Sequence, residues 1–199
     1  MTSDSAQHVS LKPVPSVEMV TNGLSVGDLN DLCDATEEAI NAGGGFGWIH
    51  LPNRNLLERF WQGVLIMPAR MLFVARLDGV ICGAAQLCLP PRNNEAQSFN
   101  IQLSGLFISP WARGQGLSRR LLDYAEKTAM KKGFAVMNLD LRESQDAAIQ
   151  LYESAGYELV GKNPHYAAVD GKFVAGRYYS KLLQPLENIK TDNADPDAE

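Results

Sequence analysis

The chain has 199 residues, of which 45% are hydrophobic and 21% are charged. This length and composition predict one globular domain that buries its own core without a disulfide or metal staple. Eighteen Lys and Arg residues against 23 Asp and Glu residues give a net charge of −5. Because a nucleic-acid binder normally carries a basic surface, we expect no nucleic-acid partner.

The three cysteines, Cys33, Cys82 and Cys88, are widely spaced and form no zinc-binding pattern with histidine. An odd count also argues against the disulfide framework of a secreted domain. The sequence contains neither an apolar run long enough to span a membrane nor a charged-then-apolar N-terminal signal. We therefore expect a cytoplasmic protein with no metal and no membrane partner.

Composition divides the chain into three parts. Residues 1–15 are polar and proline-containing, which predicts a loosely ordered N-terminal lead-in. Residues 187–199 contain five acidic residues and one lysine, which predicts an acidic, disordered tail. Residues 16–186 form the predicted folded domain.

The first half of this domain reads as two helices followed by strands. Apolar residues recur at helical spacing over 28–42, where Asp28 is a suitable N-cap. A glycine-rich loop, 43–47, separates this segment from a second predicted helix. The later apolar runs include two strands joined by Asp78-Gly79, a strong hairpin signal. The expected ranges are 56–66 for the second helix and 71–77, 80–89 and 98–108 for the strands.

The second half alternates helices and strands. Apolar residues from Leu117 to Ala129 trace one face of a helix that ends near Gly133. Residues 134–141 form a nearly continuous apolar run, which predicts a strand buried on both faces. A further helix is expected to end at Gly156, followed by strands over 157–160 and 173–182. The combined pattern predicts an α+β fold around one mixed sheet.

The segment with most chemical information is Arg113-Gly114-Gln115-Gly116-Leu117-Ser118, where a strand runs through a glycine turn into a helix. The first-turn amides of a helix lack internal partners, and the helix dipole is positive at that end. Such a turn can hold an anion, most simply a pyrophosphate. It lacks the residues that define a nucleotide P-loop or a dinucleotide fingerprint. A tight structural connection is the alternative interpretation.

A second motif favours the anion-binding interpretation of this turn over a purely structural one. The turn resembles the Arg/Gln-x-x-Gly-x-Gly/Ala signature of the GCN5-related N-acetyltransferase (GNAT) family. The later segment 148–157, AIQLYESAGY, resembles that family's A-I-x-L-Y-x-x-x-G-F/Y motif. Within the family the chain looks most similar to the tabtoxin-resistance type of acetyltransferase, through the Gly-Phe segment 44–48 and the Gly-x-x-Pro-x-Tyr-Ala element at 161–167.

The resemblance implies a mixed, mostly antiparallel sheet flanked by helices, with two strands that splay apart to form a cleft for acetyl-CoA as cosubstrate. Main-chain groups of Leu106, Phe107 and Ile108 would bond the pantetheine arm. Gln145 stands where many members have an asparagine that contacts the same arm. The pyrophosphate would be held by Arg113, Gly114, Gln115, Gly116, Leu117 and Ser118.

Tyr152 would then sit near the sulfur and protonate the departing thiolate. Direct transfer to an amine needs a neutral nitrogen, a polarised thioester carbonyl and a proton for the leaving group. A phenol can donate that proton. The alternative is that Tyr152 is a half-buried packing residue on an amphipathic helix.

The base that accepts the ammonium proton is less clear from the sequence. Gln102 occupies the position where related sequences often have an acid, and Gly105 replaces a common lysine. Asp140, at the end of a strand expected to be buried, is the candidate, because burial without a cation favours a carboxylate that takes up protons. Asp140 could instead cap a loop or pair with Arg142, and Glu143 is a weaker candidate base.

The sequence thus predicts a cytoplasmic N-acetyltransferase that moves an acetyl group from acetyl-CoA to a primary amine of a small molecule. One rival is a protein or peptide N-acetyltransferase, and another is a CoA-binding module without turnover. A weaker candidate for contact with the acceptor is His165, and weaker candidates for contact with CoA are Arg119 and Arg120. Loop 43–47 could form a lid over the acceptor, with Phe46 and Trp48 as its walls. The oligomeric state stays open, with a homodimer through the last strands as one arrangement.

Overall fold

A computed structural model describes residues 12–44 and 47–188. The start of the lead-in, Phe46 of the predicted lid and the end of the tail lie outside the described residues. The strands are β1 Pro15–Met19, β2 Arg70–Leu77, β3 Val80–Cys88, β4 Asn100–Ile108, β5 Val136–Arg142, β6 Glu158–Val169 and β7 Lys172–Leu182. The main helices are α1 Val26–Asn41, α2 Arg54–Ile66, α3 Leu117–Lys131 and α4 Asp146–Ser154.

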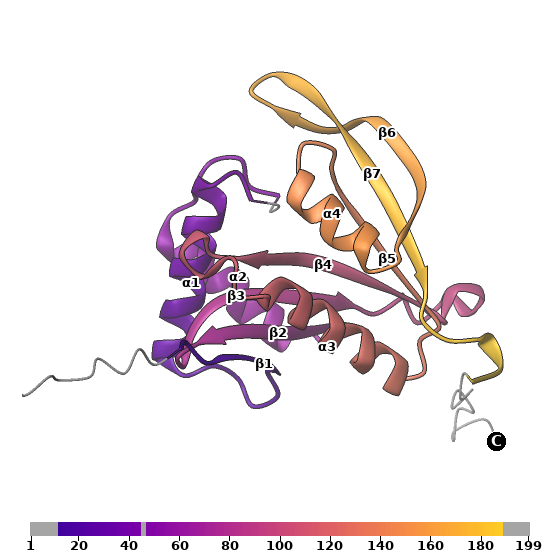
Figure 1. The fold of residues 1–199 in the computed structure, drawn as a ribbon, viewed down its shortest axis with the longest axis horizontal. Coiled ribbons are helices and arrows are strands. Elements are labelled where there is room, and N and C mark those ends of the chain that lie inside the picture. The colour runs from indigo at the N-terminus through magenta and orange to yellow at the C-terminus, as the bar shows by residue number, and fades with distance from the viewer. Residues whose placement is uncertain (1–11, 45–46, 189–199) are drawn as a thin grey trace, which may run out of the picture.

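The strands form one mixed sheet in the order β1-β2-β3-β4-β5-β7-β6. Neighbouring strands are antiparallel except for β4 and β5, which run parallel. The helix α3 supplies the crossover between those two strands (Figure 1). The predicted α+β fold with a mostly antiparallel sheet is therefore confirmed.

Some local predictions were wrong or incomplete. The N-cap of α1 is Ser25, whose hydroxyl accepts a hydrogen bond from the Asp28 amide at 3.0 Å. Asp28 instead lies in the first turn, where its charge is favourable to the helix dipole. Strand β1 was not predicted, and β6 extends to Val169 rather than ending near Val160.

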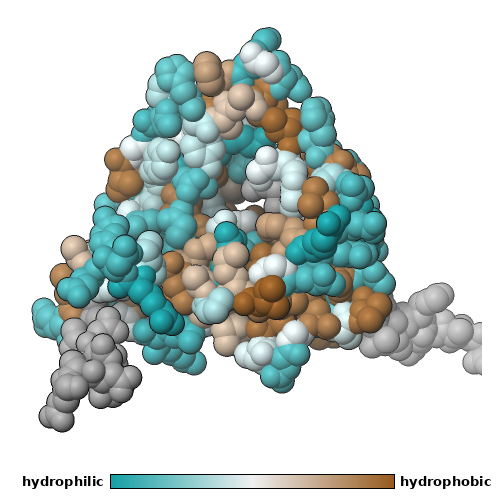
Figure 2. All heavy atoms as spheres, turned by 180° about the vertical axis from the view of Figure 1, so that it is seen from behind, coloured by the Kyte–Doolittle hydropathy of each residue, from teal (hydrophilic) through white to brown (hydrophobic). Residues whose placement is uncertain are grey.

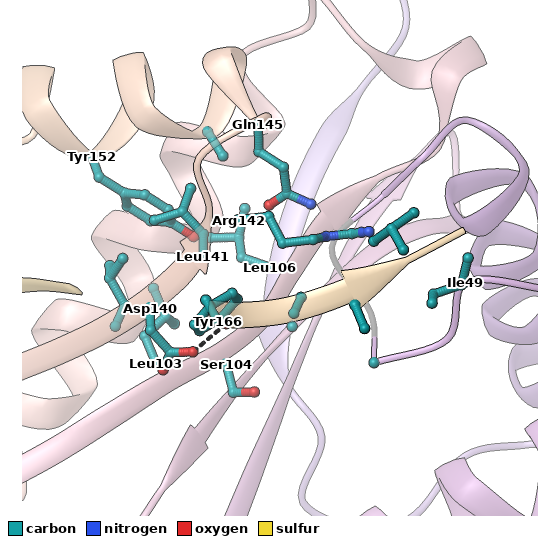
Figure 3. Close-up of a pocket in the computed structure, with 17 residues that line it drawn as sticks. Ile49, Leu103, Ser104, Leu106, Asp140, Leu141, Arg142, Gln145, Tyr152 and Tyr166 are labelled. Atoms are coloured by element: carbon teal, nitrogen blue, oxygen red, sulfur yellow. Dashed lines mark hydrogen bonds between the residues drawn. The ribbon is translucent and has the colours of Figure 1, made fainter. Parts of the chain in front are cut away.

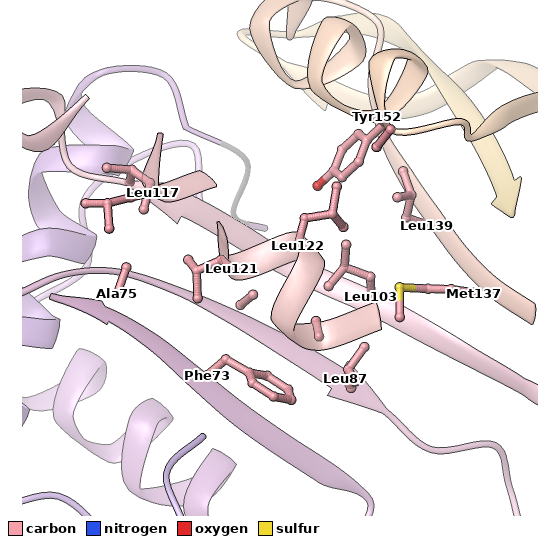
Figure 4. Close-up of a cluster of buried hydrophobic side chains, with 14 of the residues drawn as sticks. Phe73, Ala75, Leu87, Leu103, Leu117, Leu121, Leu122, Met137, Leu139 and Tyr152 are labelled. Atoms are coloured by element: carbon pink, nitrogen blue, oxygen red, sulfur yellow. The ribbon is translucent and has the colours of Figure 1, made fainter. Parts of the chain in front are cut away.

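Two apolar cores lie on opposite faces of the sheet. Helices α1 and α2 pack on one face, around Trp61 and Phe107. Helix α3 covers the other face, where Leu117, Leu121 and Leu122 lie over strands β2 to β5 (Figure 4). Burying such side chains stabilises the fold by about 1.5–3 kcal/mol each. Both faces of the sheet are thus packed against helices over strands β2, β3 and β4.

Strands β4 and β5 are hydrogen-bonded only at their beginnings, with Gln102 opposite Asn138 as the last pair. Beyond this point the two strands separate, as the family resemblance implied. Strand β5 is buried on one face only, since Met137, Leu139 and Leu141 are buried while Asp140 is exposed. The prediction of a strand buried on both faces was therefore wrong.

Candidate active site

A cavity of about 550 Å³ opens where β4 and β5 separate, and 17 residues line it (Figure 3). Its walls come from β4, β5, α4, β6 and the loop between α1 and α2. The molecular surface is visibly hollowed near the middle when seen from behind (Figure 2). Side chains that are far apart in the sequence therefore meet in one accessible space.

A β-bulge in β4 shapes one wall of the cavity. Ala84 pairs with Phe107 and Gln86 with Ser104, so a single residue of β3 faces both Gly105 and Leu106. Gly105 has φ +60°, a left-handed conformation that favours glycine. The bulge accounts for the glycine at this position and places Leu106 among the lining residues.

The carboxylate of Asp140 is held from two strands. Gln102 Nε2 of β4 donates a hydrogen bond to Asp140 Oδ1 at 2.8 Å. The Tyr166 hydroxyl of β6 donates to Asp140 Oδ2 (Figure 3). Each carboxylate oxygen keeps a further lone pair for another donor. The expected burial of Asp140 is wrong, since the residue is exposed to the cavity, and it does not pair with Arg142.

The position of Tyr166 follows from an irregularity in β6. Asn163 pairs with Gly176 and Ala167 pairs with Val174, so three residues of β6 lie opposite Ala175 alone. Pro164 lies in this stretch and cannot donate to the ladder. The local bulge turns Tyr166 into the cavity, where its ring packs on Gly176. Burial raises the pKa of Tyr166, helped by the neighbouring charge of Asp140, so its hydroxyl remains a donor.

Tyr152 of α4 points its hydroxyl toward Leu106 and Leu141 at the strand separation (Figure 3). The residue is 6% exposed, and burial raises the pKa of its phenol, with a further contribution from the Asp140 charge. Within the described part of the chain its hydroxyl has no hydrogen-bond partner. The phenol therefore stays protonated at neutral pH and has a proton to give. Tyr152 also packs edge-on against Tyr157, as expected if the residue contributes to packing as well.

The turn before α3 presents a row of unpaired backbone amides. Among the described residues, none of the N–H groups from Gly114 to Arg119 has a hydrogen-bond partner. Gly114 and Gly116 have φ values of +79° and +72°, and the space beside each is open. Gly116 is the N-cap of α3 and provides no side chain to cap it. Such a turn fits a phosphate-bearing ligand, which would complete these bonds.

The predicted site residues fall into two groups. Leu106, Asp140, Gln145 and Tyr152 line the cavity. The others are absent from the cavity wall. Phe107 and Ile108 bury their side chains in the two cores, so that only their main chain is offered at the strand edge. Arg113, Gly114, Gln115, Gly116, Leu117 and Ser118 continue from β4 into α3.

The weaker candidates have other partners. Glu143 forms ion pairs with Lys162 and Arg177, each at 2.7 Å, and these cations lower its pKa, which makes it a poor base. His165 packs edge-on against Phe173 outside the cavity wall. Arg119 forms an ion pair with Asp123 within α3.

Sequence reasoning missed two residues of the cavity. Tyr166 was noted only as part of a motif, and its approach to Asp140 depends on the bulge that Pro164 could have indicated. Arg142 was considered only as a partner for Asp140, whereas its guanidinium donates to the carbonyl of Gly44 at 2.9 Å. Gln102, at the position where related sequences often have an acid, donates a hydrogen bond directly to Asp140.

Among the described residues, no cluster indicates metal-dependent or cysteine-based chemistry. The described residues hold no group of three or more His, Cys, Asp or Glu side chains placed to bind a metal. Burial raises the pKa of both Cys33 and Cys82 to about 11, which suits core residues rather than nucleophiles. Among the helices described, none has the length and apolar character needed to cross a membrane.

Residues 33–157 match the model of the acetyltransferase (GNAT) family, which covers well over half of the chain. The chain belongs to the GNAT family of acetyltransferases. It is therefore an acyltransferase enzyme, and the family resemblance read from the two motifs is confirmed. GNAT enzymes use acetyl-CoA, and the cleft at the separated strands is the candidate place for it.

Three curated relatives are similar in sequence, and the two that are named for an acceptor differ in what they acetylate. An N-acetyltransferase of Azospirillum brasilense, described as uncharacterized and located in the hisH–hisA intergenic region, is 57% identical over 122 residues, 61% of this chain and 73% of the relative. The aminoglycoside N(6')-acetyltransferase type 1 of Klebsiella aerogenes is 29% identical over 53% of this chain and 70% of its own. The [ribosomal protein bS18]-alanine N-acetyltransferase of Escherichia coli K12 is 38% identical over 40% of this chain and 51% of its own.

Solved structures agree on the fold. An N-acetyltransferase from Staphylococcus aureus Mu50 superposes with a TM-score of 0.73 at 18% identity, covering 86% of this chain and 99% of that one. The Salmonella typhimurium protein yncA, solved with its cofactor acetyl-CoA, gives a TM-score of 0.70 at 17% identity, covering 94% and 99%. At these identities the likeness concerns the fold alone.

Proposed function

We propose that this enzyme transfers the acetyl group of acetyl-CoA to a primary amine of a small molecule by direct transfer. The observation that carries the proposal is the meeting of Tyr152 and Asp140 in one cavity at the separation of β4 and β5. A protonated phenol and a hydrogen-bonded carboxylate are the acid and base that aminolysis of a thioester requires.

Acetyl-CoA would bind through main-chain groups rather than charged side chains. Its pyrophosphate would accept hydrogen bonds from the free amides of residues 114–119, including those of Gly114, Gln115, Gly116, Leu117 and Ser118. The pantetheine arm would lie along the edge of β4 at Leu106, Phe107 and Ile108, which β5 leaves unpaired. Gln145, on the cavity wall, would contact the same arm, and Arg113 would flank the turn.

The chemistry then follows from two residues. The cosubstrate supplies an activated acyl group, and the amine nitrogen forms a bond to its carbonyl carbon as the carbon–sulfur bond breaks. Asp140 would take the proton that the ammonium must lose, while Gln102 and Tyr166 hold its carboxylate in place. Tyr152 would give its proton to the departing sulfur, and the proton that the nitrogen loses as the amide forms would restore the phenol.

The size and position of the cavity favour a small acceptor. Walls from the α1–α2 loop, at Gly47 and Ile49, and from β6, at Ala167 and Val169, enclose it on the acceptor side. Acceptance of a peptide N-terminus is the second candidate, since one curated relative is named for such an activity. The similarity to the tabtoxin-resistance type, a homodimer through the last strands and a cytoplasmic location remain predictions from the sequence.

The test is acetyl-CoA turnover across a panel of amines that includes amino acids, polyamines, aminoglycosides and short peptides. Release of CoA would be followed with a thiol reagent, and acetyl-CoA binding by calorimetry on the same preparation. We expect turnover with one class of small amines. Turnover with peptides alone would favour the second candidate, and binding without turnover would favour a CoA-binding module. Absence of acetyl-CoA binding would refute the proposal altogether.

A further inference from the structure

The cavity contains one negative and one positive side chain. Of the 17 lining residues, Asp140 and Arg142 alone are charged at neutral pH. They are two positions apart in β5, so both project from the same face of the sheet, with Cα atoms roughly 7 Å apart. The backbone thus places an aspartate and an arginine on the same wall of the cavity.

Neither charge forms an ion pair with another described residue. Asp140 accepts hydrogen bonds from the uncharged donors Gln102 and Tyr166. Arg142 donates to the main-chain oxygen of Gly44, and no acid within the described residues forms an ion pair with it. Its side chain extends along the cavity past Gln145 toward Ile49, on the acceptor side (Figure 3). A half-buried guanidinium keeps several N–H donors available for an anion.

This arrangement differs from that of several arginines outside the cavity wall. Arg177, on the neighbouring strand β7, is paired with Glu143 at 2.7 Å and has its charge satisfied. Arg54 and Arg76 likewise lie against acids. Arg142 is therefore available to a ligand in a way that these residues are not.

We infer that the acceptor is an amino acid or a closely similar zwitterion, whose ammonium lies at Asp140 and whose carboxylate is bound by Arg142. The inference rests on the proposed function and adds a substrate class to it. A polycationic acceptor such as an aminoglycoside would meet one carboxylate and be repelled by Arg142. A peptide N-terminus would leave the guanidinium without an anion, because an amide follows its first residue.

The test compares amino acids with their primary carboxamides, which keep the amine and the side chain but lose the negative charge. For each pair, kcat/KM is measured for the wild-type enzyme and for Arg142→Gln, Arg142→Lys and Arg59→Gln. Glutamine is shorter than arginine and loses both the charge and the bond to the Gly44 carbonyl, whereas lysine keeps the charge and most of the length, so the two variants together show what the charge contributes. Arg59 is an exposed arginine of α2 outside the cavity and serves as the matched control.

We expect the preference for the acid over the amide to fall about tenfold or more in Arg142→Gln, as for loss of a charge-assisted hydrogen bond. Arg142→Lys should retain part of the preference and Arg59→Gln all of it. The acid and its amide differ in amine reactivity, but the same pair is used with every enzyme, so this difference cancels when the ratio of a variant is compared with that of the wild type. An unchanged ratio in Arg142→Gln would overturn the inference. Acetylation of amines that carry no carboxylate, with no amino acid accepted, would also overturn it. Both results would leave the proposed acetyl transfer itself in place. Failure to bind acetyl-CoA would instead refute the proposed function and the inference together.

Discussion

Tyr166 lies over Gly176 on the neighbouring strand, and its ring occupies the space that a side chain at position 176 would need. The same tyrosine donates a hydrogen bond to Asp140. The missing side chain of one residue therefore permits the contact that orients the proposed base. Gly176 has no left-handed backbone, so its role lies in this close approach rather than in conformational freedom.

A methyl group at position 176 should displace Tyr166 and weaken acetyl transfer. We expect Gly176→Ala to lower kcat about tenfold, because Asp140 would lose one of its two oriented donors, while the affinity for acetyl-CoA stays the same. The matched control is Gly161→Ala on β6, where an added Cβ would lie 4.0 Å from its nearest described neighbour, an ordinary contact. Equal losses in the two variants would contradict the explanation.

Removing the Tyr152 hydroxyl should impair chemistry and leave binding intact. We expect Tyr152→Phe to lower kcat about 10²-fold or more, the usual contribution of a general acid, with the acetyl-CoA dissociation constant within a few-fold of the wild-type value. Tyr157→Phe is the control, since that buried ring packs against Tyr152 but directs its hydroxyl to the Met137 sulfur at 3.0 Å. Retention of turnover in Tyr152→Phe would show that Tyr152 only packs.

The glycine turn before α3 offers a test of acetyl-CoA binding. The test separates the backbone strain of a substitution from its effect on contact with the phosphates. Gly116→Ala and Gly171→Ala both force alanine into a left-handed conformation, at φ +72° and +74°, with open space around the new methyl group. Each should cost about 1–2 kcal/mol of stability. We expect the Gly116 variant alone to lose about tenfold in acetyl-CoA affinity, because its methyl group would hinder the approach of the phosphates. Calorimetry and thermal unfolding of both variants provide the two readouts.

The buried tyrosines should make stability fall at alkaline pH. Burial raises the pKa of Tyr157, which is 3% exposed, above its ordinary value near 10. Above that pH the unfolded chain loses the phenolic proton while the folded chain keeps it, so the free energy of unfolding falls as pH rises. The slope is about 1.4 kcal/mol per pH unit for each such group.

Replacement of Tyr157 by phenylalanine should make this slope smaller by the contribution of one titrating group. Denaturant unfolding of the wild type and of Tyr157→Phe between pH 9 and 11 measures the difference. If both proteins lose stability at the same rate with pH, the tyrosine is not the group that titrates.

Local signals in the sequence were sufficient for most of the fold. The Asp78-Gly79 pair predicted the β2–β3 hairpin, and both residues have positive φ as such a turn requires. The family resemblance implied the separation of β4 and β5, and the apolar periodicity from Leu117 to Ala129 predicted the helix α3 between them. The N-cap of α1 was wrong because Asp28 and Ser25 are both suitable capping residues, and only the structure distinguishes them.

The contacts of the site could not be read in the same way. Asp140 meets Gln102 from 38 positions earlier and Tyr166 from 26 positions later. Both meetings depend on how strands pair and on bulges that shift a side chain from one face to the other. A pattern of apolar residues does not encode such shifts. It also made β5 look buried, although the helices α1 and α2 leave the face carrying Asp140 uncovered.

The separation of β4 and β5 has a mechanical consequence. Strands β1 to β4 are joined to strands β5, β7 and β6 by only three paired residues of β4 and β5. The backbone hydrogen bonding of the sheet is therefore weakest at the cleft. A cosubstrate bound between the open edges of β4 and β5 would contact both strands and hold the two parts of the sheet together. Occupancy of the cleft and resistance to unfolding are then thermodynamically linked, and the melting temperature should rise with acetyl-CoA concentration.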